Sequence, residues 1–361
     1  MDNVKRIEEI IANLKNKEFN IYFFTVDTKG NPNASVANIY EHVKILGDLG
    51  YNAHVLYEKD DYTGVGDWLG EEYSSVSHKV TKDLNVEPCD IIIIPEVFAH
   101  VMESLAKYPW KKIVMSQSYS YIFEILGIGK SWHYDYKFGD VITTTEAQAE
   151  YIRNHFPGIK THVVAPSIPE YFKKPETLKV PVIGIMTRDQ KDVLHIVKSF
   201  YLQYPMYKWV TFKDLRGTPK QQFADEIASH CLSVWVDKPS SFGTFPLESI
   251  QCGTPVIGVI PDMVPEWMIN PGDGETGPSL KENGIWTDNI LNIPNLIAEY
   301  MRLWLEDSVP ETIYRAMSET AGSYSPELQK KTVKQVYTKL IDERLEEFNN
   351  ALKNEKSKEN E

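Results

Sequence analysis

The stretch of sequence that decides the fold is Leu232–Met268, LSVWVDKPSSFGTFPLESIQCGTPVIGVIPDMVPEWM. Ser233–Val236 is a short apolar run that predicts a strand buried on both faces. After a polar loop, Pro246 can begin a helix, because a first-turn residue needs no N–H donor, and Gly253 ends it. Pro255–Val259 predicts the next buried strand. In open parallel α/β sheets the ligand binds at the loops that follow such strands, and a helix N-terminus there attracts an anion, typically phosphate.

Glu248 lies one turn inside this helix, where its carboxylate can accept hydrogen bonds from a pair of sugar hydroxyls. The motif around it, FGTFPLESIQCGTPVIG, resembles the signature of the retaining, nucleotide-sugar-dependent glycosyltransferases of the GT-B fold, family four in particular. The resemblance implies that Glu248 binds the ribose of a nucleotide. The family's first Glu contacts the donor sugar; Ser240 stands in its place here, and Ser241 replaces the Gly that follows. The loop residues that the resemblance places at the nucleotide are Gly243, Thr244 and Phe245.

Two cations follow the first strand of the second half, in VPVIGIMTRDQKDVL. Arg188 and Lys191 come just after the strand end, where positive charge can stabilise a diphosphate leaving group. The family has a Gly-Arg-like turn and a nearby Lys at this point, and Thr187 here replaces the Gly. The resemblance therefore implies a catalytic and phosphate-binding role for both cations. The alternative is that both are solvated loop charges.

Three polar residues of the first half are candidates for contact with the donor sugar or the acceptor: Asn33, Gln117 and Tyr119. Asn33 lies where the family has a glycine-rich loop, and it can equally cap the helix that follows. Gln117 stands where many relatives carry a His near the reacting sugar, and Tyr119 follows in the same hydroxyl-rich loop; a plain polar loop is the alternative. We interpret the aromatic cluster at 132–138 as core rather than acceptor site, and the pair Glu266–Trp267 as capping and packing.

Short buried strands alternate with helical patterns along the chain, which predicts parallel α/β sheets. Strands are predicted at 21–26, 53–57, 90–94, 113–115, 141–144, 162–165, 182–186, 208–212, 233–236, 255–259 and 284–286. Helices are predicted at 37–49, 98–107, 147–155, 192–204, 220–229, 246–252, 264–269 and 293–305.

Together with the resemblance, this pattern predicts the GT-B fold, in which two Rossmann-like parallel-sheet domains face each other across a cleft. The expected parts are an N-terminal acceptor domain at 1–170, a linker at 171–181, a C-terminal donor domain at 182–325, a helix at 326–349 and a frayed tail at 350–361. The family's pattern implies that the helix at 326–349 packs back on the first domain.

The composition limits the classes of function that the chain can have. The chain has 361 residues, 42% of them hydrophobic, and a net charge of −13, which argues against a nucleic-acid partner. Its three cysteines stand alone, which is typical of reduced buried thiols, and the N-terminus has no apolar signal region, so we expect a cytoplasmic protein. No HxH, HxxxH or strand-linked Asp-x-Asp motif is present, so we expect no metal and no other cofactor.

The sequence thus predicts a glycosyltransferase of the hexosyltransferase type, used in polysaccharide or glycoconjugate synthesis. It would move a sugar from a nucleoside-diphosphate donor to a hydroxyl of a glycan or lipid-linked acceptor, with retention of the anomeric configuration. A lipid-linked acceptor would be compatible with peripheral contact between the protein and a membrane. One alternative, favoured by Ser240, is a non-catalytic GT-B protein that binds a nucleotide sugar or glycan and supports a partner enzyme. Another is a GT-B epimerase, for which Glu96 and His100 are the candidate groups. The donor sugar, the base, the acceptor and the oligomeric state stay open.

Overall fold

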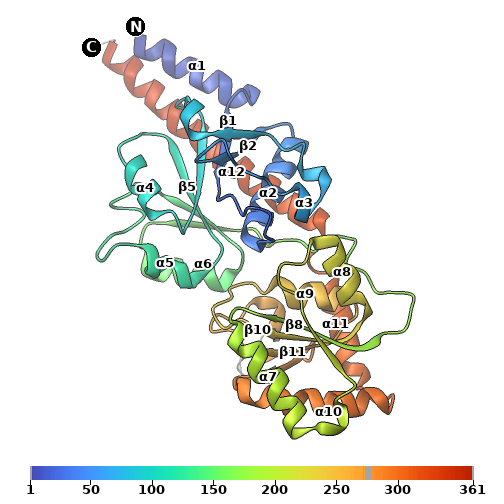
Figure 1. The fold of residues 1–361 in the computed structure, drawn as a ribbon. Coiled ribbons are helices and arrows are strands. Elements are labelled where there is room, and N and C mark those ends of the chain that lie inside the picture. The colour runs from blue at the N-terminus through green and yellow to red at the C-terminus, as the bar shows by residue number, and fades with distance from the viewer. Residues whose placement is uncertain (1, 271, 273–277, 360–361) are drawn as a thin grey trace.

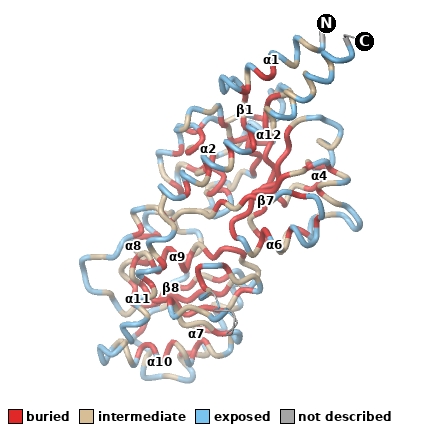
Figure 2. The backbone as a smooth tube through the Cα atoms, turned by 180° about the vertical axis from the view of Figure 1, so that it is seen from behind, coloured by how far each residue is buried: buried red, intermediate tan, exposed pale blue. Residues whose placement is uncertain are grey.

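The computed structural model describes residues 2–270, 272 and 278–359. It contains two parallel sheets, each covered by helices on both faces, and this confirms the predicted class of two parallel α/β domains (Figure 1). We call the seven-stranded sheet with its helices the first domain and the five-stranded sheet with its helices the second domain. Figure 2 shows buried residues concentrated along the strands of both sheets. Among the described residues, no helix is both long and apolar enough to cross a bilayer.

The sheet of the first domain has the order β3-β2-β1-β4-β5-β6-β7, with every pair parallel. Its strands are β1 (Asn20–Phe24), β2 (Asn52–Tyr57), β3 (His78–Val80), β4 (Ile91–Pro95), β5 (Lys111–Ser116), β6 (Asp140–Thr143) and β7 (Lys160–Val163). Its helices are α1 (Asp2–Asn16), α2 (Ala34–Asp48), α3 (Gly66–Leu69), α4 (Ala99–Leu105), α5 (Tyr119–Ile125) and α6 (Glu146–His155), with short 3-10 turns η1 (Glu71–Tyr73) and η2 (Thr81–Asp83). The sequence did not predict β3, α1, α3 or α5.

The sheet of the second domain has the order β14-β11-β10-β8-β9, again all parallel. Its strands are β8 (Val180–Thr187), β9 (Thr211–Asp214), β10 (His230–Val236), β11 (Val256–Val259) and β14 (Ile285–Thr287), and a small antiparallel pair joins β12 (Ile269–Asn270) to β13 (Ser279–Leu280). Its helices are α7 (Gln190–Gln203), α8 (Lys220–Ser229), α9 (Thr244–Gln251), α10 (Ile293–Leu305) and α11 (Glu311–Ala321), with 3-10 turns η3 (Pro205–Tyr207), η4 (Glu266–Met268) and η5 (Ile290–Asn292).

Three local predictions in the second domain are wrong. The strand expected at 208–212 lies at β9, because η3 occupies Pro205–Tyr207 and delays it. The helix expected at 264–269 is only the short turn η4. The helix expected from Pro246 begins two residues earlier, at Thr244, because Gly243 adopts a left-handed conformation that turns the chain before the proline.

The last helix, α12 (Pro326–Glu359), leaves the second domain and runs along the first (Figure 1). Tyr337 and Leu340 are fully buried in the core of the first domain, where α12 packs against α1 and α2. The helix extends past the predicted end at 349, so residues 350–359 are helical rather than frayed, and the rest of the predicted tail lies outside the described residues. The partner that the sequence prediction overlooked is α1, which lies alongside and contributes an ion pair from Glu8 to Lys356.

The chain crosses from the first domain to the second between β7 and β8. Ile168 and Phe172 already belong to the core of the second domain, with exposed fractions of 4% and 0%. The backbone N–H of Ile168 also donates to the carbonyl of Tyr324, just before α12, at 2.8 Å. The chain passes between the domains twice, at 164–179 and just before α12, and this hydrogen bond joins the two connecting segments.

Candidate functional site

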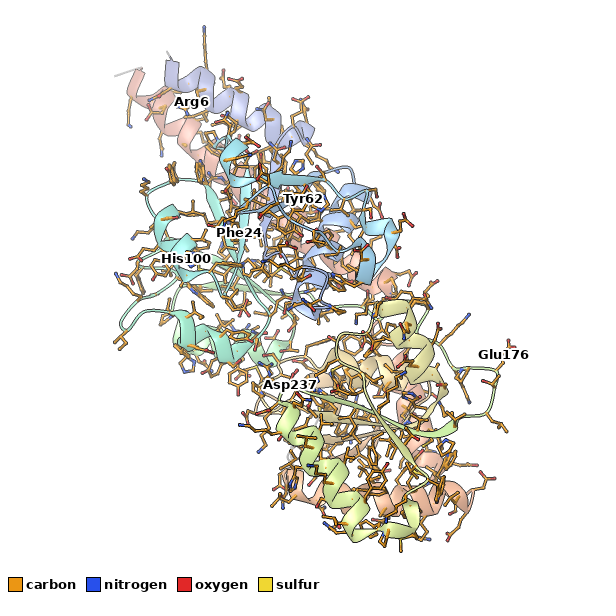
Figure 3. The ribbon with its side chains drawn as sticks, viewed as in Figure 1. Arg6, Phe24, Tyr62, His100, Glu176 and Asp237 are labelled. Atoms are coloured by element: carbon orange, nitrogen blue, oxygen red, sulfur yellow. The ribbon has the colours of Figure 1, made fainter. Side chains whose placement is uncertain are left out.

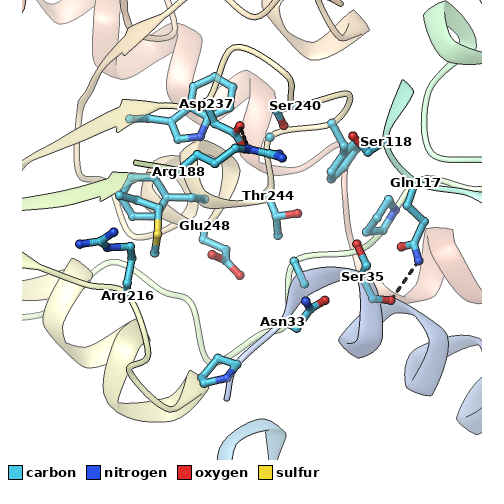
Figure 4. Close-up of a pocket in the computed structure, with 18 of the residues that line it drawn as sticks. Asn33, Ser35, Gln117, Ser118, Arg188, Arg216, Asp237, Ser240, Thr244 and Glu248 are labelled. Atoms are coloured by element: carbon cyan, nitrogen blue, oxygen red, sulfur yellow. Dashed lines mark hydrogen bonds and ion pairs between the residues drawn. The ribbon is translucent and has the colours of Figure 1, made fainter. Parts of the chain in front are cut away.

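A cleft of about 490 Å³ lies between the two domains. Its walls are loops that follow the carboxyl ends of parallel strands: those after β1, β5 and β6 from the first domain, and those after β8, β9 and β10 from the second. This is the edge at which open α/β sheets bind their ligands. Figure 4 shows the two walls, with Asn33, Ser35 and Gln117 facing Arg188, Thr244 and Glu248.

The cleft brings most of the predicted site residues together. The nine that line it are Asn33, Gln117, Arg188, Ser240, Ser241, Gly243, Thr244, Phe245 and Glu248. Lys191 and Tyr119 are not among its lining residues. Three further charged residues line it that the sequence did not single out: Arg216, Lys220 and Asp237.

Gly243 fixes the start of α9. Its φ of +75° is left-handed, and a Cβ placed there would lie 3.1 Å from the rings of both Trp235 and Trp267. Glycine is therefore required by backbone conformation and by space. The turn directs the first residues of α9 toward the cleft, and the N–H groups of a first helical turn have no acceptor within the helix. Because the helix dipole adds partial positive charge at this end, the start of α9 is suited to bind an anion.

Glu248 is buried at the floor of the cleft, with 2% of its surface exposed. Its carboxylate accepts a hydrogen bond from the ammonium group of Lys220, the first residue of α8. The same ammonium group lies 5.3 Å from the ring centre of Phe223 and 5.6 Å from that of Phe172. Burial of a carboxylate is costly unless it is paired and hydrogen bonded, and Lys220 supplies that partner for Glu248.

Arg188 follows β8 and is held in a fixed orientation. Its Nε donates to Asp237 Oδ1 at 2.7 Å, and one terminal nitrogen donates to Tyr121 Oη of the first domain at 3.3 Å. Arg216, in the loop after β9, is similarly held by Asp214, with Nε 2.9 Å from Oδ1. Both arginines line the cleft, and each guanidinium group is held by a carboxylate of its own domain.

Lys191 does not join Arg188 as expected. Helix α7 begins at Gln190 with Asp189 as its N-cap, and the backbone N–H of Lys191 donates to the Asp189 side chain at 2.9 Å. The early helix start leaves the Lys191 side chain exposed on α7. In the cleft, Lys220 supplies the second cation beside Arg188.

On the first domain's wall, Asn33 and Gln117 combine lining and structural roles. Asn33 caps α2 by accepting from the backbone N–H of Val36 at 3.0 Å. The amide of Gln117 donates to the Ser35 carbonyl and accepts from Asn38 Nδ2, each at 3.0 Å. The position of Asn33 is thus compatible both with helix capping and with contact to a ligand, since it caps α2 and also lines the cleft.

Glu96 and His100, the epimerase candidates, do not line the cleft. Glu96 is buried beneath it and accepts from the backbone N–H groups of Gln117 and Ser118 at 2.9 and 2.7 Å. Burial raises the pKa of Glu96 to about 7, although these hydrogen bonds act in the opposite direction. His100 is exposed on α4, and Figure 3 shows it far from Asp237 of the cleft.

Tyr119 and Ser241 lie where the domains touch. The backbone N–H of Tyr119 donates to Ser241 Oγ at 2.9 Å, and Tyr119 Oη donates to Asp262 Oδ2 at 2.9 Å. Tyr119 therefore contributes to the contact between the domains rather than to the lining of the cleft. Ser240 does line the cleft, and its backbone N–H donates to the carbonyl of Asp237 at 3.1 Å.

The remaining candidates are structural in this arrangement. Trp132 and Phe138 are buried in the first domain's core, as the core interpretation of the aromatic cluster predicted. Trp267 is buried in the second domain, and Glu266 accepts from the backbone N–H of Ala147 at the start of α6. Within the part of the chain that the structure describes, no three His, Cys, Asp or Glu side chains gather as a metal site would require.

No protein-family model matches this chain, and no curated protein sequence does. Solved structures do match. Sucrose-phosphate synthase from Thermosynechococcus elongatus superposes with a TM-score of 0.63 at 12% identity, covering 90% of this chain and 99% of that one. The pneumococcal O-GlcNAc transferase GtfA, solved with UDP and GlcNAc, gives 0.61 at 11% identity, over 90% and 99%.

A third match is HepE from Anabaena in complex with UDP-glucose, with a TM-score of 0.57 at 11% identity, over 89% of this chain and 99% of that one. At such low identity these likenesses show the fold alone. They confirm that the chain has the GT-B architecture, with its two parallel-sheet domains and the cleft between them.

Proposed function

We propose that this chain is a glycosyltransferase that binds a nucleoside-diphosphate sugar in the cleft between its domains. It transfers the sugar to a hydroxyl of a glycan or lipid-linked acceptor. The observation that carries the proposal is the position of Glu248: a buried carboxylate one turn inside α9, in a cleft that is also lined by Arg188 from the loop after β8, Arg216 from the loop after β9, and Lys220 at the start of α8. GT-B structures solved with UDP and GlcNAc, or with UDP-glucose, support the same class of donor.

The diphosphate is bound by Arg188, Lys220 and the first turn of α9. Arg188 and Lys220 reach the cleft from different strands, and the N–H groups of Thr244 and Phe245 add donors that need no side-chain movement. Arg216 adds a third positive charge from the loop after β9. Donors fixed before the reaction stabilise the charge that develops on a leaving phosphate at little reorganisation cost.

The nucleoside is bound on the second domain. Glu248, paired with Lys220, accepts hydrogen bonds from the two ribose hydroxyls. The apolar side chains of Met186, Leu215 and Phe245 line the same side of the cleft and offer a surface for the base. The sugar then points toward Ser240 and Ser241 on one side and toward Asn33 and Gln117 on the other.

The transfer breaks the bond between the anomeric carbon and the phosphate oxygen, and forms a bond from that carbon to the acceptor oxygen. We propose attack on the face from which the diphosphate leaves, so that the configuration is retained. The leaving phosphate oxygen takes the proton of the acceptor hydroxyl, and no side chain has to act as a strong base. This fits the cleft, whose carboxylates Asp237 and Glu248 are both engaged by cations.

The test is release of the nucleoside diphosphate from UDP-, GDP-, dTDP- and ADP-sugars, with and without simple sugars as acceptors. Release from one donor that increases with an acceptor, and is lost in Glu248→Ala, supports transfer. Ser240, which stands where the resemblance places a sugar-contacting Glu, favours the second candidate, a protein that binds a nucleotide sugar without transferring it. That candidate predicts tight nucleotide binding, no release, and no gain of activity in Ser240→Glu.

A further inference from the structure

The segment Asp262–Trp267, which we call the coupling segment, runs from the loop after β11 into η4. It contacts two parts of the molecule, which also touch each other directly through the bond from Tyr119 to Ser241. One part is the donor loop, residues 237–243 between β10 and α9, which carries Ser240, Ser241 and Gly243 to the cleft. The other part is the first domain. No residue of the coupling segment lines the cleft itself.

Two N–H groups of the coupling segment hold the donor loop. The indole Nε1 of Trp267 donates to the carbonyl of Phe242 at 2.6 Å, in a buried position. The backbone N–H of Asp262 donates to the carbonyl of Lys238 at 2.9 Å. Since Phe242 directly precedes Gly243, the Trp267 bond fixes the peptide that turns the chain into α9.

The indole ring of Trp267 is itself held on several sides. Its edge bounds the space beside Gly243, where a Cβ would approach it to 3.1 Å, and it lies edge-to-face against Trp286 at 5.8 Å between ring centres. The carbonyl of Trp267 accepts from Asn283 Nδ2 at 2.8 Å. A ring packed in this way cannot move without displacing the loop that it contacts.

Two carboxylates of the coupling segment reach the first domain. Asp262 Oδ2 accepts from Tyr119 Oη at 2.9 Å, at the start of α5. Glu266 Oε1 accepts from the backbone N–H of Ala147 at 2.8 Å, in the first turn of α6. A carboxylate at a helix N-terminus is stabilised by the helix dipole, so this contact favours the observed placement of the two domains.

Within the six residues of the coupling segment, the carboxylates of Asp262 and Glu266 thus contact the first domain, and the N–H groups of Asp262 and Trp267 contact the donor loop. We propose that Trp267 is a positioning residue that fixes the donor loop, and that the coupling segment transmits contact with the first domain to that loop. The effect on donor binding rests on the proposed function, whereas the effect on the loop itself does not. Because such coupling is reciprocal, a ligand that orders the donor loop also favours the contact between the domains.

The first experiment needs no ligand. Amide hydrogen exchange is measured over residues 237–250 in the full chain, in Trp267→Phe and in Trp286→Phe. Both variants lose one indole N–H from the same cluster, but Trp286 Nε1 donates to Asn283 and not to the donor loop. We expect exchange in Trp267→Phe to rise by about 5- to 10-fold, and exchange in Trp286→Phe to stay near that of the wild type. Equal exchange in the two variants would overturn the positioning role.

The second experiment removes only the two side-chain hydrogen bonds between the coupling segment and the first domain. It uses the double variant Tyr119→Phe with Glu266→Ala. Its matched control is Glu146→Ala, which removes a carboxylate from the same end of α6 that pairs with Arg153 instead. We expect faster exchange over 237–250 in the double variant and not in the control. Unchanged exchange in the double variant would refute transmission through the coupling segment.

The third experiment measures the affinity for UDP by calorimetry in the same variants. We expect about 5- to 10-fold weaker binding in Trp267→Phe and in the double variant, and affinities near that of the wild type in the two controls. If the wild type binds UDP but the two test variants bind it equally well, the inference fails. If the wild type binds none of UDP, GDP, dTDP and ADP, the proposed function fails, and the exchange measurements still decide the inference.

Discussion

Lys220 and Glu248 form a buried ion pair at the floor of the cleft, with side-chain exposed fractions of 15% and 3%. Lys220 is the first residue of α8, and Glu248 lies one turn inside the neighbouring helix α9. A charge withdrawn from water needs a partner, and removal of one partner is far more costly than removal of both. The pair therefore links the stability of the second domain to the group that we assign to the ribose.

Replacement of Lys220 by Met is expected to lower the free energy of unfolding by about 3–5 kcal/mol, because it leaves a buried carboxylate unpaired. The double variant Lys220→Met with Glu248→Gln is expected to recover most of that stability without recovering nucleotide binding. Urea unfolding and calorimetry with UDP measure the two effects. Nucleotide binding in the double variant that equals the wild type would show that this pair only stabilises the fold.

Arg188 and Lys191 are expected to differ sharply, since only Arg188 lines the cleft. Arg188→Ala should weaken nucleotide binding by about 10- to 100-fold, the usual range for a lost hydrogen bond to a charged group. Lys191→Ala should change it by no more than about twofold, as an exposed side chain would. Similar losses in both variants, measured by calorimetry, would mean that the loop after β8 binds phosphate in another conformation.

Glu96 is expected to make stability depend on pH. Burial raises its pKa to about 7 in the folded chain, above the value of 4.5 for an unperturbed Glu, so its contribution to stability is complete below pH 4.5 and is lost as the pH rises through 7. As the pH rises from 4.5 to 8, the free energy of unfolding of the wild type should therefore fall relative to that of Glu96→Gln by up to about 3 kcal/mol. Urea unfolding across this range measures the difference, with exposed Glu124→Gln as the control. A difference that does not change with pH would contradict the assignment.

Removal of divalent cations is expected to leave transfer unaffected. In the proposed complex, Arg188, Lys220 and the start of α9 balance the phosphate charges. The two carboxylates that line the cleft, Asp237 and Glu248, are paired with Arg188 and Lys220. Activity is measured after dialysis against EDTA, and again with added Mg²⁺ or Mn²⁺. A loss on dialysis that either ion restores would require a metal in the mechanism.

The central strands of the two sheets could be predicted because they are buried on both faces. Ile91–Pro95 and His230–Val236 are buried throughout, and such strands are continuous apolar runs. The edge strand β3 has only three residues, HKV, with one of them exposed, so it gave no apolar signal. Helix α5 was missed for a similar reason, because its seven residues follow directly on a polar loop.

Within the site, residues near the motif could be predicted and their distant partners could not. Glu248 and Gly243 lie inside the motif itself, whereas Lys220 lies 28 residues before Glu248 and meets it only through the packing of α8 against α9. Lys191 is the converse case. Its distance from Arg188 in the sequence is short, but the helix begins at Gln190 and places the side chain on the outer surface.

The central claim is that the cleft binds a nucleoside-diphosphate sugar through Glu248 and Arg188. Thermal unfolding with UDP-, GDP-, dTDP- and ADP-sugars tests it most directly, in the wild type, Glu248→Ala and Arg188→Ala. A ligand present at 100 times its dissociation constant should add about 2.7 kcal/mol of stability. We expect one nucleotide to raise the melting temperature of the wild type and of neither variant. An equal rise in all three proteins, or no rise with any donor, would contradict the claim.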